Sequence, residues 1–145
     1  MKLFFTSLLF FLSFHLNGQW FSLPKNYMPI GINAGGGGSG GVFGGELSFL
    51  HFNDEIGYGL FFDAVKNKNG TRIFAGPEFL ALYKSKFIIG LEAGAVRNTG
   101  SNKTGFMAGI FIPYYVIPYF RFFYLDRKSF AEAGFLFKFP IPLGN

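Results

Sequence analysis

The amino-acid sequence predicts an all-β fold: an antiparallel up-and-down transmembrane β-barrel of eight strands. Two observations predict it. From residue 30 onward, apolar and polar side chains alternate in segments of about ten residues, which is typical of barrel strands. Within those segments the charged residues share one face with most of the glycines, and the opposite face is almost entirely apolar. A soluble barrel has the reverse arrangement, so the apolar face needs lipid around it.

The composition limits the classes of protein to which the chain can belong. Half of its 145 residues are apolar and 14% are charged, which suits one folded domain and excludes a disordered chain. The absence of cysteine excludes disulfide scaffolds, thiolate metal sites and lipoprotein anchors. The net charge of +5 comes from scattered residues, so we expect no nucleic-acid partner. We also expect no cofactor and no metal.

Residues 1–18 have the features of a cleaved secretory signal peptide. Lys2 precedes an apolar run from Leu3 to Phe14, and a short polar exit follows as far as Gly18. The run is shorter than the roughly 20 residues of a spanning helix. An uncleaved membrane anchor is the alternative. We expect residues 19–145 to form the β-barrel domain of the exported protein.

Eight segments carry the alternation. They are 28–36, 41–52, 56–66, 71–83, 87–97, 105–116, 118–125 and 130–141. Turn-forming residues fill the breaks between them, which are Gly35–Gly41, Asn53–Glu55, Asn67–Gly70, Lys84–Lys86, Asn98–Thr104, Val116–Pro118 and Asp126–Ser129. We expect Gly35–Gly41 to be a flexible surface loop. Phe106–Tyr124 is apolar enough for a transmembrane helix, but its prolines favour two strands joined at a corner.

Splitting each segment into its two faces places every charge of a strand body on the glycine-rich face. We call these residues the interior charge network: Glu46, Asp63, Arg72, Glu78, Glu92, Arg121, Glu132 and Lys138. Because an unpaired buried charge is costly, we expect the five carboxylates to pair with the three bases in a structural role. A general acid–base site is the alternative interpretation of the same residues.

Across Ile30–Ile141 this pattern resembles the small outer-membrane β-barrels of the OmpA/OmpX type. The resemblance implies tight turns at the periplasmic end, longer loops at the outer end and a location in the outer membrane of a Gram-negative bacterium. It implies lipid and the outer-membrane assembly machinery as partners, and we expect a monomer. The chain departs from this family because it continues past Phe139 and Ile141 to Asn145 instead of ending on an aromatic residue.

The function expected from this fold is a structural or surface-interacting one, such as adhesion or ligand binding. An eight-stranded barrel is filled by its own side chains, so we expect no open pore. Basic residues with Asp126 as the single acid lie at the outer ends of the strands, and they are candidate contacts for lipopolysaccharide phosphates or another anionic ligand. These residues are Lys66, Lys68, Arg97, Lys103, Arg127 and Lys128. The alternative is that they only keep the loops solvated.

Two other functional classes stay open. One is an outer-membrane lipid-modifying enzyme, which would need a base beside a nucleophile. His51 is the single histidine of residues 19–145, but it falls on the apolar face with Phe49 at the inner end. We therefore expect an interfacial anchor there, and no catalytic residues. The other class is a soluble lipocalin-like barrel, which would require the charged face to point outward.

Overall fold

The computed structural model describes residues 26–53, 56–83, 86–113 and 116–143, and the regular elements in these ranges are β-strands. The expected signal peptide, residues 1–18, lies outside the described residues. The strands are β1 (Asn26–Tyr27), β2 (Ile30–Gly37), β3 (Gly40–Phe52), β4 (Ile56–Asn67), β5 (Gly70–Tyr83), β6 (Lys86–Asn98), β7 (Lys103–Phe111), β8 (Ile117–Leu125) and β9 (Lys128–Phe139). No helix in these ranges is long and apolar enough to span a membrane.

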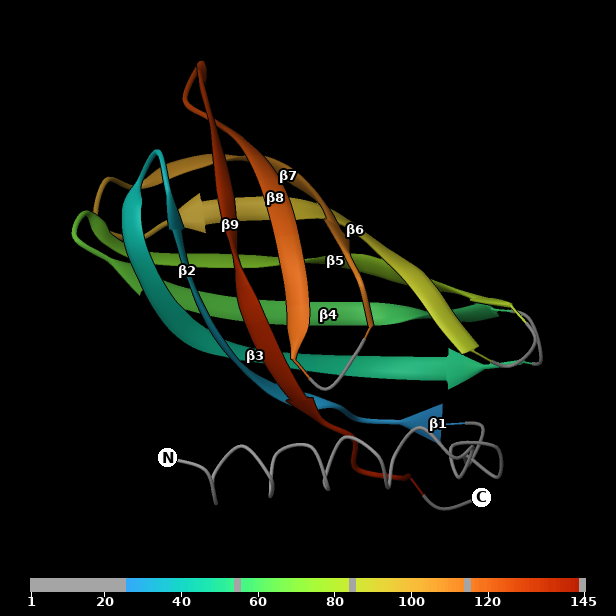
Figure 1. Cartoon of the computed structure of the whole chain (residues 1–145). Helices are drawn as coiled ribbons and strands as arrows, with labels where there is room; N and C mark the ends of the chain where they lie inside the picture. Colours follow the sequence, from blue (N-terminus) through green and yellow to red (C-terminus); the bar gives the residue numbers. More distant parts are fainter. Residues whose placement is uncertain (1–25, 54–55, 84–85, 114–115, 144–145) are drawn as a thin grey trace, which may run out of the picture.

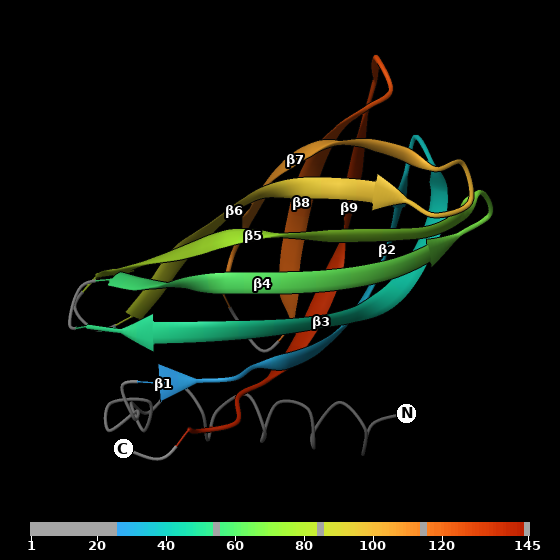
Figure 2. The ribbon, with the colours of Figure 1, turned by 180° about the vertical axis from the view of Figure 1, so that it is seen from behind.

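The strands close into a barrel. From β2 to β9 each strand pairs antiparallel with the next one in the chain, and β9 pairs with β2, with Ile30 opposite Phe139 (Figure 1). The short β1 continues the line of β2 and pairs with the last residues of β3. The prediction of an eight-stranded antiparallel up-and-down barrel is therefore confirmed. Figure 2 shows from behind the wall that β3 to β6 form.

The two ends of the barrel differ in what they contain. The terminal end holds the first and last described residues, where the Leu143 N–H donates to the Asn26 carbonyl at 3.1 Å. The Met28 N–H likewise donates to the Ile141 carbonyl at 2.9 Å, so the residues after Phe139 continue the pairing of the wall. The opposite end, the distal end, consists of the hairpin turns 38–39, 68–69, 99–102 and 126–127.

The distal turns are shorter than the resemblance implies. Each connects its strands with two residues, except the four-residue turn at 99–102. The expected loop Gly35–Gly41 is wrong, because Gly35–Gly37 belong to β2 and Gly40–Gly41 to β3, leaving Gly38 and Ser39 as the turn. Gly40 has a φ of +88°, a conformation that glycine adopts without strain in a tight hairpin. The glycines therefore let the strands continue to the end of the hairpin.

The predicted corner at Val116–Pro118 is also misplaced. β7 ends at Phe111 rather than at residue 116, and Pro118 lies inside β8 opposite Phe135. Proline is tolerated near the first residue of a strand. The Pro118 carbonyl still accepts a hydrogen bond from the Ile112 N–H at 3.1 Å. The region predicted as a possible helix is thus two strands, as the sequence favours.

Buried apolar side chains form two clusters inside the barrel. The distal cluster comprises Val42, Phe61, Val65, Phe74, Val96, Met107, Phe123 and Leu125. The terminal cluster comprises Tyr27, Leu50, Leu80, Phe111, Ile117, Tyr119 and Leu136. Most of the interior charge network lies between the two clusters.

The outer surface of the barrel is apolar on every strand from β2 to β9. We call this surface the apolar belt, and its large exposed residues include Ile30, Ile32, Phe43, Phe49, Tyr58, Leu60, Phe62, Phe79, Leu91, Phe106, Ile110, Phe120, Phe122, Phe135, Phe137 and Phe139. Leu60 and Phe139, for example, are 62% and 64% exposed. Soluble monomeric proteins rarely expose a continuous apolar surface of this kind. The outward face of the strand bodies is therefore apolar, and the charges of the strand bodies lie on the inward face together with the two apolar clusters.

Candidate functional site

The structure places all eight residues of the interior charge network on the inward face. Arg72, Asp63, Glu78 and Arg121 are fully buried. Glycines provide the space that these side chains occupy: a Cβ added at Gly109 would lie 2.8 Å from Glu92 Cγ and 3.0 Å from Arg121 Cγ. The mixture of glycine and charge on one face of the sequence is thus a packing requirement of a narrow barrel.

Arg121 is the centre of the larger half of the network. Its Nη1 donates to Asp63 Oδ2 at 2.7 Å, and its Nη2 donates to Glu46 Oε2 at 2.8 Å. Its Nε and Nη2 also donate to the two oxygens of Glu92. One guanidinium on β8 therefore holds carboxylates from three other strands, using the planar set of donors that lysine lacks.

Lys138 links a fourth carboxylate, that of Glu78, to the same group. Its Nζ lies 2.5 Å from Glu46 Oε1 and 2.6 Å from Glu78 Oε1. Glu46 therefore bridges Lys138 and Arg121, and four carboxylates share two bases in this half of the network. Register places Glu46 opposite Asp63, and Arg121 contacts both of these carboxylates. Register also places Glu78 opposite Glu92, and these two pair with different bases, Lys138 and Arg121.

The smaller half of the network is the buried ion pair between Arg72 and Glu132. The Arg72 guanidinium also packs on aromatic rings, with its Cζ 4.5 Å from the centroid of Phe123 and 5.3 Å from that of Phe130. Arg72 Nε and Nη1 have no hydrogen-bond partner in the described part of the chain. The rings supply cation–π contacts where hydrogen bonds are missing.

Three uncharged residues complete the network, in addition to the eight charged residues predicted from the sequence. Asn33 Nδ2 donates to Asp63 Oδ2 at 2.6 Å, and Tyr119 Oη donates to Glu132 Oε1 at 3.3 Å. Ser48 Oγ donates to Glu46 Oε1 and accepts from Lys138 Nζ, both at 3.2 Å. All three lie on the inward phase of their strands, so the same alternation could have identified them.

The contacts of the network join acids to bases on the inner face of the barrel wall. The buried Ser48 lies between an acid and a base and is covered by the barrel wall. His51 is elsewhere, on β3 at the terminal end, with Nδ1 2.8 Å from Asn26 Oδ1 and its ring 5.3 Å from the Tyr58 ring. Among the described residues, no group of three or more His, Asp or Glu side chains is arranged to hold a metal ion.

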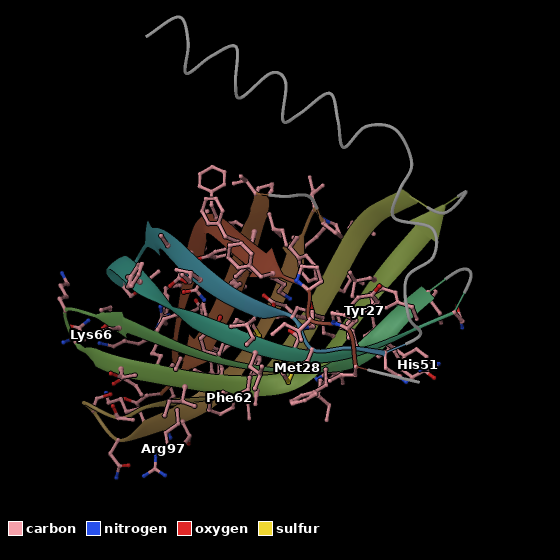
Figure 3. The ribbon with its side chains drawn as sticks, turned by 90° about the horizontal axis from the view of Figure 1, so that it is seen from below. Tyr27, Met28, His51, Phe62, Lys66 and Arg97 are labelled. Carbon is pink, nitrogen blue, oxygen red and sulfur yellow. The ribbon has the colours of Figure 1, made fainter. Side chains whose placement is uncertain are left out.

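All six basic residues expected at the outer ends of the strands lie at the distal end, where all are exposed. We call them, with Asp126, the distal rim. Lys103 forms an ion pair with Asp126, and Arg97 Nη2 donates to Asn102 Oδ1 at 2.8 Å. The hydrogen bond and charge of Lys103 lower the pKa of the Asp126 carboxyl. The rim therefore has an excess of positive charge. Figure 3 shows Lys66 and Arg97 at this end and His51 at the other.

Comparison with protein-family models, with curated proteins and with solved structures gives no match for this chain, so the fold and the contacts above carry the functional argument.

Proposed function

We propose that the chain is a small bacterial outer-membrane β-barrel without an open pore, exported by its N-terminal signal peptide. The observation that carries this proposal is the distribution of side chains, with an apolar belt outside and a paired charge network inside. A closed barrel satisfies its own backbone hydrogen bonds, so it is stable in the hydrocarbon of a membrane, where lipid surrounds the apolar belt. We propose on the same grounds that the chain is a barrel of the OmpA/OmpX type.

The interior supports the absence of a pore. The apolar clusters at both ends leave the charges between them paired with each other, as in Arg121 with Glu46. An eight-stranded barrel is about wide enough to hold its own side chains. We therefore expect no ion conductance from the folded protein.

The role that fits this architecture is a structural one in the membrane, with the distal rim as its interacting surface. Turns of two to four residues offer little surface for binding a protein, whereas six exposed bases suit anionic groups close to the barrel wall. Lipid and the outer-membrane assembly machinery are the partners, and the protein acts as a monomer without a cofactor.

Neither alternative explains the contacts as well. A lipocalin-like barrel binds an apolar ligand in its interior, but Glu46, Glu78, Glu92 and Glu132 all point inward here. A lipid-modifying enzyme would pair its histidine with a nucleophile, but the contacts of His51 are to Asn26 and Tyr58.

Expression of the full chain in a Gram-negative host tests the proposal. We expect the protein in the outer-membrane fraction, with faster migration on detergent gels before boiling than after it. The matched control lacks residues 2–18 and should stay in the cytoplasm. Recovery of the mature protein as a soluble monomer without detergent would contradict the proposal, and steady conductance in planar bilayers would contradict the closed interior.

A further inference from the structure

Lys66 and Arg97 differ from all other charged residues whose side chains the structure describes in that each lies within a strand on the outward phase. Both are exposed and follow outward-facing residues two positions earlier on β4 and β6. Each strand continues for one residue beyond them, so pairing with the neighbouring strands fixes the backbone at both positions. The other bases of the distal rim lie in turns or on the inward phase.

The register brings these two residues to one part of the barrel wall. Lys66 is opposite Thr71 of β5, and Arg97 is opposite Ile73 of the same strand. With strands about 4.8 Å apart and a step of two residues along β5, the two backbones are roughly 12 Å apart. Long basic side chains can therefore reach a single group held between them. Thr71, opposite Lys66, also accepts a hydrogen bond from the Thr99 N–H, so both threonines lie in this part of the wall.

The charges of the neighbourhood favour an anion. Arg97 uses one of its N–H groups on Asn102 and keeps the others available. Asp126 is the acid of the distal rim, and it is already paired with Lys103 at the start of β7. A phosphate between Lys66 and Arg97 would thus meet two cations without a competing carboxylate among the described residues.

The surface directly below the pair is part of the apolar belt. Phe62 on β4 and Phe106 on β7 are 49% and 56% exposed, and the small residues Ala75 and Ala95 lie between them in the same row. Along the outer wall from the distal end, the two cations therefore come first and the apolar surface follows. A phosphorylated lipid has the same order, with its phosphate at the membrane surface and its acyl chains beneath.

We propose that the outward face of β4 to β6 binds one phosphate-bearing lipid of the leaflet that meets the distal end. Its phosphate is held by Lys66 and Arg97, and its acyl chains lie along Phe62, Ala75 and Ala95. This inference rests on the proposed function, because only a barrel in a membrane presents this face to lipid. A lipid fits better than a soluble anion because the cations face the same direction as the apolar belt.

Native mass spectrometry of the full mature chain folded into phosphatidylcholine vesicles containing lipid A tests the site. The test variant is Lys66→Gln/Arg97→Gln. The charge-matched control, Arg127→Gln/Lys128→Gln, removes two other bases of the distal rim, from the β8–β9 hairpin, and so measures how much of the retention comes from general attraction by the rim. After release into mild detergent we expect the wild type to retain one lipid A. Retention should fall by about tenfold or more in the test variant and by less than about twofold in the control.

The outcomes separate this inference from the proposed function. Equal losses in the two variants would show general attraction by the rim, and full retention by the test variant would show a site elsewhere; either overturns the inference. Displacement of lipid A by inorganic phosphate would overturn it in favour of a free-anion site. A folded, membrane-inserted barrel that retains no lipid A contradicts the inference alone, whereas failure to insert into vesicles contradicts both.

Discussion

Arg121 and Glu46 are 75 residues apart in the chain, yet Arg121 Nη2 lies 2.8 Å from Glu46 Oε2 inside the barrel. The contact joins β8 to β3, which are separated by β9 and β2 in the wall. Both side chains are at most 1% exposed, so no water compensates either charge if the other is removed. The interior charge network therefore connects strands that share no ladder hydrogen bonds.

Replacing Arg121 should strongly destabilise the barrel. Arg121→Met leaves Glu46, Asp63 and Glu92 without their shared cation, and the loss of one partner from a buried ion pair costs about 3–5 kcal/mol. Urea unfolding in detergent micelles measures the change. Arg97→Met, at an exposed position, should change the free energy of unfolding by no more than about 0.5 kcal/mol. Equal midpoints for both variants would refute the structural role of the network.

A matched pair of glycine substitutions tests the packing of the narrow interior. At Gly109 a new methyl group would contact Glu92 and Arg121, so Gly109→Ala should cost about 1–3 kcal/mol. At Gly45, which faces outward, the nearest atom to a new Cβ is the Gly31 carbonyl oxygen at 3.5 Å. Gly45→Ala should therefore be neutral or stabilise by about 0.4–1 kcal/mol. The same unfolding assay compares them, and a reversed order would contradict the inward orientation of Gly109.

Arginine substitutions at different depths of the apolar belt distinguish a lipid-facing surface from a water-facing one. Leu60 lies midway along β4, and Leu60→Arg should destabilise the vesicle-inserted barrel by about 2–4 kcal/mol. Phe43 lies beside Lys66 near the distal end, where the cost should be about 0–1 kcal/mol. Both side chains are just over 60% exposed, so burial within the protein does not separate them. Equally small effects would show that water surrounds this surface.

The ion pair of Lys103 with Asp126 predicts that the stability of the barrel depends slightly on pH in the acidic range. Because the hydrogen bond and charge of Lys103 lower the pKa of Asp126, the folded state favours the carboxylate. This contribution is present above the unfolded pKa of about 3.9 and is lost as the pH falls through the lower folded value.

Asp126→Asn provides the comparison, since asparagine also tolerates the φ of +52° found here. We expect the wild type to have a slightly higher thermal midpoint than the variant at pH 7 and the difference to vanish near pH 2, roughly two units below the ordinary carboxyl pKa. Contributions of the interior charge network are common to both proteins and cancel. A difference that increases toward low pH would contradict the prediction.

The hairpin ends could be predicted less well than the strand bodies. Glycine is a turn signal in isolation, so the sequence alone predicted a loop at Gly35–Gly41. In the barrel Gly35–Gly37 pair with both β3 and β9, as Gly35 does with Val42 and Gly134, and Gly40 and Gly41 pair with β2. Partners that are distant in the chain thus override the local preference. The strand bodies show no such difference: the predicted segments 56–66 and 87–97 already contain Lys66 and Arg97, and the structure extends each strand by one residue beyond them.

Alternation with a period of two depends only on the strand itself, and for this reason the sequence alone determined the strands, their two faces and the inward position of the charges. It did not determine which acid meets which base. Register places Arg121 opposite Glu132, but Glu132 pairs with Arg72, and Arg121 with carboxylates across the interior. Those contacts depend on the closure of β2 against β9 and on the stagger of strands that are remote in the chain, which only the tertiary structure decides.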